Sequence, residues 1–339
     1  MSPELASLLR ILAAVGLMLM NGVILIYMLR RVLGRLHQRL GPVHVGPQGL
    51  LQTPMDVLKL LTKEDITPTN VDKALYFIAP AAVFTPSLMA YAAIPFSPTW
   101  MVTDLDTGLL YTLVVMSLVS MGLLMAGWAS ANKWSLIGGM RSVGQHIAYE
   151  IPLLLSVLPV VMYVGTLNLS SIVEAQSGTW LGILPQWFIT NPLFWPAFII
   201  FIVSALIKVN QTPFDMSEAE SELVAGFATE YSSMKFGLFF LSEFSNSFIV
   251  SALAVTLFFG GWTLPFVPDE VLAPIAPVVF MLKVYVGIFV LMWIRGTLPR
   301  VRMDHLMQFA WKILIPAVLT WILVFGFIIK LFDLGRPVG

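Results

Sequence analysis

The sequence is divided by long stretches that carry no charged side chain, each about as long as a lipid bilayer is thick. A membrane-spanning helix needs about 20 mostly apolar residues. Seven windows approach or exceed this length without Asp, Glu, Lys or Arg, and an eighth, between Glu270 and Arg295, is interrupted only by Lys283. Because the bilayer core offers no hydrogen bonds to the backbone, such segments must satisfy their own backbone groups, and a helix does so.

These windows predict an all-α integral membrane protein with about eight transmembrane helices. Only 11% of the 339 residues are charged, compared with about 25% in soluble domains. We expect a single polytopic membrane domain over residues 1–339, with a first span that is retained and not a cleaved signal peptide. The expected spans are residues 8–29, 73–95, 108–130, 145–166, 190–209, 236–259, 273–294 and 311–332.

Basic residues gather in the loops that follow the odd-numbered spans, whereas the other loops are apolar or acidic. Cytosolic loops of membrane proteins carry an excess of Lys and Arg. We therefore expect a multi-pass protein of the cell (inner) membrane with both termini on the non-cytosolic side. The expected cytosolic loops are residues 30–72, 131–144, 210–235 and 295–310.

The first of these loops contains a segment with an amphipathic helical pattern. Leu51, Met55 and Leu58 recur at helical spacing, while Asp56 and Lys59 fall on another face. This pattern is typical of a helix that lies in the membrane interface, and a short helix that packs on its own protein explains it equally well. Both interpretations predict an additional, cytosolic-side amphipathic helix.

The composition limits the chemistry that this chain can perform alone. The chain has no cysteine, so it has no disulfide and no cysteine-ligated iron–sulfur cluster. Its four histidines are scattered without the spacing of metal ligands, and we expect no metal. Its zero formal net charge argues against a nucleic-acid partner. We expect no redox centre in this chain.

The third expected cytosolic loop concentrates five of the chain's 19 acidic residues. These acids are Asp215, Glu218, Glu220, Glu222 and Glu230. Ionisable groups at such a place are expensive for a membrane protein and indicate a functional site. Helix capping is the alternative for two of them, because Ser217 and Glu220 have the spacing of a capping box and Glu218 would favour the positive end of a helix dipole.

Two more acids, Glu150 and Glu243, fall within expected spans. A carboxyl group that is partly desolvated and exchanges a proton near neutral pH suits proton relay. A salt bridge from Glu150 to Arg141 or Lys133 that only braces the helices is the alternative. Lys283 either pairs with one of these carboxylates or extends its amine toward the membrane surface.

The run PFD-x-x-EAESELVAG-x-x-x-EYS, which begins at Pro213, resembles the motif of the membrane subunit at the heel of respiratory complex I, the proton-pumping NADH:quinone oxidoreductase. Three further cytosolic segments resemble that family in the same order along the chain. They contain Gln38, Arg39, Gly41 and Pro42 in the first loop, Gly127 to Glu150 in the second, and Arg295 to Met307 in the last.

The resemblance implies a subunit that forms the quinone chamber, links quinone reduction to proton translocation and docks the peripheral arm. It also implies that quinone is the substrate, and that the iron–sulfur clusters and flavin are carried by partner subunits. The implied proton-relay residues are Glu150, Asp215, Glu218, Glu220, Glu222, Glu230 and Glu243. The implied residues of the quinone path are Arg35, Gln38, Arg39, Asp56, Phe214 and Arg300.

The implied partners are other complex I subunits and membrane lipid. Those subunits are the quinone-site and terminal iron–sulfur subunits of the arm, small membrane subunits and antiporter-like subunits. Leu29 and Lys208 stand where the family usually has acids, which leaves the proton route, the quinone and the electron donor open. The alternatives are the homologous membrane subunit of a ferredoxin-, coenzyme F420- or hydrogenase-linked complex, and a stand-alone ion transporter, against which the absence of an inverted repeat argues.

Overall fold

The computed structural model describes residues 3–98, 100–180, 184–216, 220–265, 267 and 269–333, and most of these residues are helical. The long helices are α1 (Pro3–Leu36), α3 (Lys73–Tyr91), α4 (Gly108–Ala129), α5 (Lys133–Val164), α7 (Trp195–Lys208), α9 (Ser233–Phe258), α10 (Asp269–Thr297) and α12 (Ile315–Phe332). The short ones are α2 (Gln52–Thr62), α6 (Leu169–Glu174), α8 (Glu220–Leu223) and α11 (Met303–Phe309).

Single turns and one small hairpin connect these helices. Strands β1 (Thr179–Trp180) and β2 (Leu184–Pro185) pair antiparallel. The 3-10 turns of the described residues are η1 (Pro47–Gly49), η2 (Phe188–Thr190), η3 (Pro192–Phe194) and η4 (Gly226–Ala228). A π-helical turn, η5 (Ala310–Leu314), joins α11 to α12 without a break.

Seven helices in the described part of the chain are long and apolar enough to span a membrane. They are Ser7–Leu36, Lys73–Tyr91, Gly108–Ala129, Lys133–Val164, Ser233–Phe258, Leu272–Thr297 and Met303–Phe332. A shorter apolar helix, Pro192–Lys208, occupies the place of the remaining expected span. The predicted fold class, an all-α multi-pass membrane protein, is confirmed, and the count of eight is approximate.

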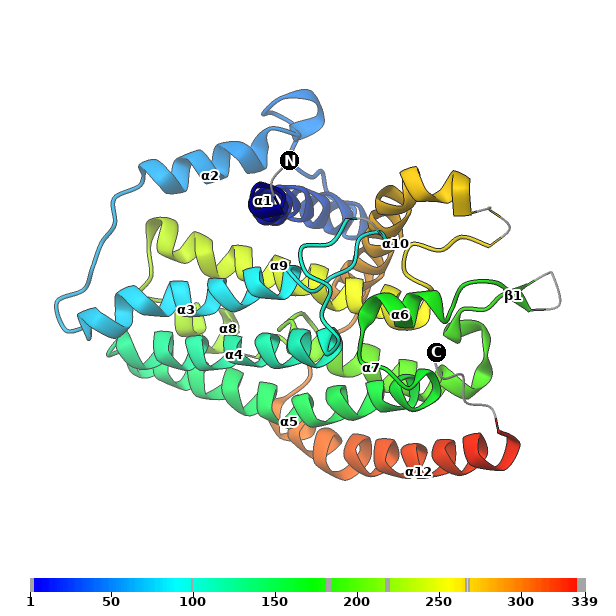
Figure 1. Cartoon of the computed structure of the whole chain (residues 1–339). Helices are drawn as coiled ribbons and strands as arrows, with labels where there is room; N and C mark the ends of the chain where they lie inside the picture. The colour runs from blue at the N-terminus through cyan, green and yellow to red at the C-terminus, as the bar shows by residue number, and fades with distance from the viewer. Residues whose placement is uncertain are drawn as a thin grey trace.

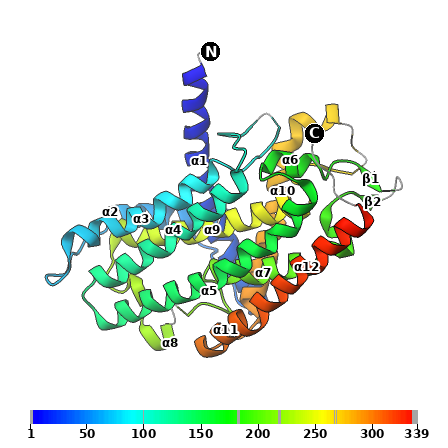
Figure 2. The same ribbon diagram turned by 60° about the horizontal axis from the view of Figure 1, so that its bottom comes forward.

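The helices are stacked in layers, as Figure 1 shows: α1 and α2 on one side, then α3 and α9, then α4 and α5, with α12 on the opposite side. Helix α3 packs against α4, α4 against α5, and α5 against α7 and α12. Figure 2 shows that α1 crosses α3, α4 and α5 steeply. Helix α1 packs against α9 and α10.

Helix α9 forms the centre of the bundle, and every residue from Phe244 to Phe258 is buried. Its small hydroxyl side chains allow neighbouring helices to approach closely, which is typical of helix packing in membranes. The Ser251 hydroxyl donates a hydrogen bond to the Val284 carbonyl of α10 (2.8 Å), and Ser242 lies 2.5 Å from Ser87 of α3. Polar atoms within this core are thereby satisfied by neighbouring helices.

Helix α2 combines both interpretations of its sequence pattern. On one side it packs against α1 and α9, where Thr53 is buried. On the other side Met55, Leu58 and Leu61 are 46%, 53% and 58% exposed. The chain itself does not cover this apolar face, so the face is free to contact a membrane or a partner.

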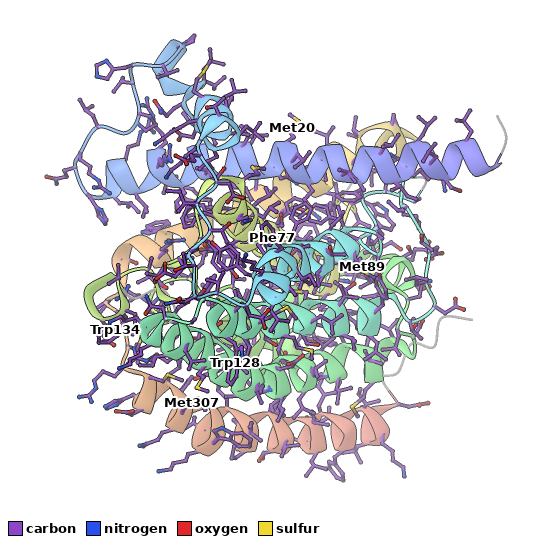
Figure 3. The ribbon with its side chains drawn as sticks, turned by 90° about the vertical axis from the view of Figure 1, so that its left-hand side faces the viewer. Met20, Phe77, Met89, Trp128, Trp134 and Met307 are labelled. Carbon is purple, nitrogen blue, oxygen red and sulfur yellow. The ribbon has the colours of Figure 1, made fainter. Side chains whose placement is uncertain are left out.

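The outer surface of the bundle is rich in large apolar side chains. Figure 3 labels Met20 on α1, Phe77 and Met89 on α3, Trp128 on α4 and Trp134 on α5. All five are exposed, between 42% and 64%. An exposed apolar surface of this kind marks contact with lipid or with other proteins.

Candidate functional site

Charged side chains of this bundle meet in pairs, and one group of them surrounds the turn that follows α7. In this turn the Pro213 carbonyl accepts a hydrogen bond from the Val301 backbone N–H (2.9 Å). The Arg300 guanidinium forms an ion pair with the Asp215 carboxylate (3.5 Å). The half-buried Phe214 packs against the cluster that contains Tyr149. The turn therefore brings the candidates Phe214, Asp215 and Arg300 together.

Glu243 belongs to the same region. It projects from α9 toward the end of α10, where Arg295 pairs with its carboxylate (3.3 Å). Both side chains are largely shielded from water. The Asp215 carboxylate interacts electrostatically with Glu243 as well. Two acids and two arginines thus lie where α9, α10 and the turn after α7 converge.

Glu150 pairs with Lys208, whose amine lies 3.8 Å from the carboxylate. The Glu150 side chain is 24% exposed and the Lys208 side chain only 3%. Within the described residues, the Lys208 amine has no hydrogen-bond partner. The predicted salt bridge of Glu150 to Arg141 or Lys133 is therefore wrong, because packing places Lys208 beside it and directs Arg141 to another acid.

Residues of α5 hold the end of α7 and the following turn in place. The Gln145 amide donates hydrogen bonds to the carbonyls of Ile207 and Phe214 (both 2.9 Å). The buried His146 places Nε2 2.9 Å from the Lys208 carbonyl. Because a carbonyl only accepts, Nε2 is the donor in this contact. Lys208 and Phe214 are therefore fixed by the same turn of α5.

A small cavity of about 30 Å³ lies between the two buried ion pairs. Lys208 and His146 line one part of it, and Glu243 and Asn246 line another. A polar cavity needs roughly 10–15 Å³ to hold one water molecule. The space is therefore large enough for water to connect the Lys208 amine with the Glu243 carboxylate.

Glu222 lies on α8 and forms a short ion pair with Arg141 of α5 (2.6 Å). The hydrogen bond and the positive charge of this guanidinium hold the pKa of the Glu222 carboxyl below its usual range. The Glu222 side chain is about half exposed. Glu222 is thus a charged group at the surface of the bundle, available to a partner.

Glu230 is held by residues of α3 and of the turn before α5. Its carboxylate accepts a hydrogen bond from the Asn132 amide (2.6 Å), and its backbone carbonyl accepts one from the Tyr76 hydroxyl (2.8 Å). The Tyr76 and Tyr231 rings stack at 4.3 Å, and burial raises the pKa of Tyr231. Glu230 and Lys133 also line an open pocket of about 460 Å³.

The remaining candidates lie at the end of α1 and on α2. Asp56 of α2 pairs with Arg30 of α1 (2.5 Å). Arg35, Gln38 and Arg39 are exposed where α1 ends. This end of α1 meets the end of α10, because the His37 Nε2 atom lies 3.3 Å from the Gly296 carbonyl.

Two predicted relay residues have no described side chain. Glu218 lies outside the described residues, as does Ser217 of the expected capping box. Glu220 begins α8, and its side chain lies outside the described part as well. The capping interpretation of these acids therefore stays a prediction.

Lys283 reaches the end of α9. Its amine donates hydrogen bonds to the carbonyls of Phe259 (2.8 Å) and Thr263 (2.6 Å) and lies 4.1 Å from the centre of the Trp187 ring. Of the two interpretations of this lysine, the structure supports extension toward the end of a span.

The partners of the buried acids are what sequence reasoning missed. Lys208 and Arg295 neutralise Glu150 and Glu243, and His146 holds the backbone of Lys208. Lys208 was visible as a departure from the resembled family, which was the available signal. Its pairing with Glu150 joins residues 58 positions apart and depends on how α5 and α7 pack.

A multi-pass helical bundle with ion pairs buried inside it and at one rim defines a class of membrane protein in which such charges serve ion or proton movement. The model of the NADH dehydrogenase family matches residues 9–326 of this chain. The chain therefore belongs to that family of membrane subunits of NADH-quinone oxidoreductase (complex I), and it is a subunit of this enzyme. The stated resemblance is confirmed.

Curated relatives agree over nearly the whole chain, and each is a subunit of NADH-quinone oxidoreductase that bears the letter H. The relative from Dehalococcoides mccartyi (strain CBDB1) is 44% identical over 312 residues, which cover 92% of this chain and 84% of the relative. The one from Brevibacillus brevis is 46% identical over 305 residues (90% and 88%). The one from Rhodospirillum centenum is 41% identical over 328 residues (96% and 94%).

Proposed function

We propose that this chain forms the membrane side of the quinone chamber and converts quinone reduction into proton translocation. The observation that carries this proposal is the pair of buried ion pairs, Glu150–Lys208 and Glu243–Arg295, on either side of a polar cavity. A bundle gains little stability from buried ion pairs, since desolvation offsets their attraction. A functional reason for their presence is therefore favoured.

The first step of the proposed mechanism takes place at the turn after α7. Reduction of a quinone head group takes up protons and changes the local charge. Phe214 offers an apolar ring, and the Asp215–Arg300 pair beside it offers charges that respond to that change. Arg35, Gln38, Arg39 and Asp56 belong to the proposed path of the quinone from the bilayer, because α2 exposes its apolar face next to them.

The second step carries the change into the bundle. Glu243 interacts electrostatically with Asp215, so a change of charge at Asp215 alters the proton affinity of Glu243. Water in the cavity between Glu243 and Lys208 then gives protons a route to the Glu150 side. Because Glu150 is partly exposed, it passes the change to neighbouring antiporter-like subunits.

The rim of the bundle provides the docking surface in this proposal. Glu222, with Glu218, Glu220 and Glu230, contacts the quinone-site and terminal iron–sulfur subunits of the peripheral arm. Those subunits carry the flavin and iron–sulfur clusters that bring electrons from NADH, and this chain carries no redox centre. The docking loops face the cytosol, and both termini lie on the other side of the membrane.

The test compares two neutralised acids with a control in the assembled complex. Glu243→Gln and Glu222→Gln should each lower quinone reductase activity, and Glu243→Gln should also lower the number of protons moved per electron. Asp304→Asn is the control, because Asp304 is largely exposed and pairs only with its neighbour Arg302 among the described contacts.

Unchanged turnover and pumping in both variants would contradict the proposal. Purification in mild detergent separates it from a stand-alone transporter, which would come out alone or as a homo-oligomer. The chains that co-purify also identify the electron donor, because an NADH-binding subunit would be absent from a ferredoxin-, coenzyme F420- or hydrogenase-linked relative.

A further inference from the structure

A larger cavity of about 430 Å³ lies between α7, α9 and α10. It is distinct from the cavity between the buried ion pairs, since the two share no lining residue. Its walls are almost entirely apolar, with Lys283 as the charged residue among them. Representative wall residues are Phe198 and Ile202 of α7, Val250 and Ala254 of α9, and Val286 and Val290 of α10.

Lys283 gives this cavity a positively charged end. Its amine donates to two backbone carbonyls and lies over the Trp187 ring. Neither contact brings a negative charge, and no ion pair of Lys283 occurs among the described residues. The carbonyls and the ring stabilise the ammonium group but do not neutralise it, so an anion nearby is attracted to it.

The charged end of the cavity lies where α9 ends. Phe259 follows the last residue of α9, and Trp187 and Thr263 belong to connecting segments. In Figure 1 this end of the bundle carries α6 and the hairpin of β1 and β2. A tryptophan beside a lysine that extends toward a helix end is typical of the level of lipid head groups.

From Lys283 the cavity continues along α10 to Leu291, which is about 12 Å at the rise of a helix. Leu282, Val286 and Val290 are 64%, 56% and 46% exposed along this length. The slot is therefore open toward the side of the bundle that faces the bilayer. An occupant needs an apolar chain in the slot and a negative group at its charged end.

We propose that this slot binds an anionic phospholipid, with an acyl chain between α7 and α10 and its phosphate at Lys283. A quinone tail matches the apolar walls, but the quinone head carries no negative charge to match the ammonium group. A bilayer supplies anionic phospholipids directly to a slot that opens sideways. This site is independent of the proposed quinone chemistry, which involves other residues.

The test measures lipid retention by the assembled complex in mild detergent. The complex is stripped of lipid and exposed to phosphatidylglycerol or phosphatidylcholine with the same acyl chains, and bound lipid is counted by native mass spectrometry. The natural protein should retain phosphatidylglycerol in preference. Lys283→Gln should reduce that preference about fivefold, as expected for one basic residue near a membrane surface, and Lys283→Arg should keep it.

A second variant tests the slot without changing the charge. Ala254 is nearly buried and lines the cavity, so Ala254→Leu fills part of it and should lower retention of both lipids equally. Lys330→Gln on α12 is the matched control for loss of a cation and should change nothing. Size-exclusion elution shows whether each variant still assembles.

Two results would overturn the proposal. One is equal retention of phosphatidylglycerol by the natural protein, Lys283→Gln and Ala254→Leu in assembled complexes. The other is a density map of the complex in which a helix of another subunit fills the slot. Failure of Lys283→Gln to assemble leaves the comparison of Ala254→Leu with the natural protein to decide.

Discussion

Lys208 and Glu150 form one ion pair but have unequal access to water, since their side chains are 3% and 24% exposed. A buried charge whose partner is removed costs several kcal/mol, while a charge that reaches water costs less. Glu150→Gln leaves the lysine buried and unpaired, whereas Lys208→Met leaves a carboxylate that water can solvate. We expect Glu150→Gln to lower stability by about 3 kcal/mol and Lys208→Met by clearly less.

The measurement is thermal unfolding of the detergent-purified protein, with Glu150→Gln/Lys208→Met completing a double-mutant cycle. The double variant should be more stable than Glu150→Gln alone, because no unpaired charge remains. Equal losses in the two single variants would show that the pair is not asymmetric.

Glu222 predicts a dependence on pH. Because its pKa is lower in the folded protein than in the unfolded chain, the stabilisation by Arg141 is complete above the unfolded value of about 4.3 and is lost as the pH falls through the folded value. We expect the melting temperature of the natural protein to exceed that of Glu222→Gln at pH 7, with the difference shrinking below pH 4. Arg141→Gln should behave like Glu222→Gln, and a constant difference would contradict the assignment.

At the scale of residues, sequence reasoning found the acids but not their partners. Glu150 and Glu243 were evident as charges inside apolar windows. The identity of Lys208 and Arg295 as partners follows from which faces of α5, α7, α9 and α10 meet, and helical spacing within one segment carries no information about that. The positions of Arg35, Gln38 and Arg39 at an exposed helix end depend in the same way on tertiary packing.

At the scale of elements, the contact of α5 with the turn η4 gives a sharp test. A Cβ atom at Gly138 would lie 2.8 Å from the Gly226 Cα atom, closer than real Cβ contacts allow. Gly138→Ala should therefore force the backbones apart and lower stability by about 1–3 kcal/mol. Gly144→Ala is the matched control on the same helix, because its nearest neighbour is the flexible end of Met303 at 3.5 Å.

Thermal unfolding of both variants in the same detergent measures this effect. Gly144→Ala should be neutral or slightly stabilising, since Ala is the better helix former. Equal behaviour of the two variants would mean that α5 and η4 do not pack as closely as described.

Long apolar windows predicted the helices well, and charged residues obscured where they end. Helix α5 begins at Lys133, inside a segment expected to be a loop, because the Asn132 side chain caps it by accepting from the Trp134 N–H (2.9 Å). Its first turns carry Lys133 and Arg141, so a search for uncharged windows stops short of them. Helix α7 is short because Pro192 and the turn η3 precede it.

At the scale of the whole molecule, the distribution of basic residues predicts which end of the bundle faces the cytosol. The chain has no cysteine, so a single introduced cysteine reports its own side of the membrane. Lys63→Cys and Ser177→Cys change exposed residues in loops on opposite expected sides. A membrane-impermeant thiol reagent should label Lys63→Cys in inverted vesicles and Ser177→Cys in intact cells stripped of their outer layers.

The reverse labelling pattern would place both termini in the cytosol and remove the docking proposal. A membrane-permeant thiol reagent controls for access, because it should label both variants in both preparations. Fold class follows from sequence in this protein because the bilayer dictates it, whereas the side on which each loop lies rests on charge alone.

The unequal burial of Lys208 and Glu150 also restricts how this lineage can change. A lysine sealed inside the bundle requires an acid beside it, but the acid, which touches water, does not require the lysine. Natural variants with lysine at position 208 should therefore always keep a carboxylate at position 150, while variants with a carboxylate at 150 are free to carry other residues at 208. The order of inheritance follows: the acid came first, and the lysine was admitted by it.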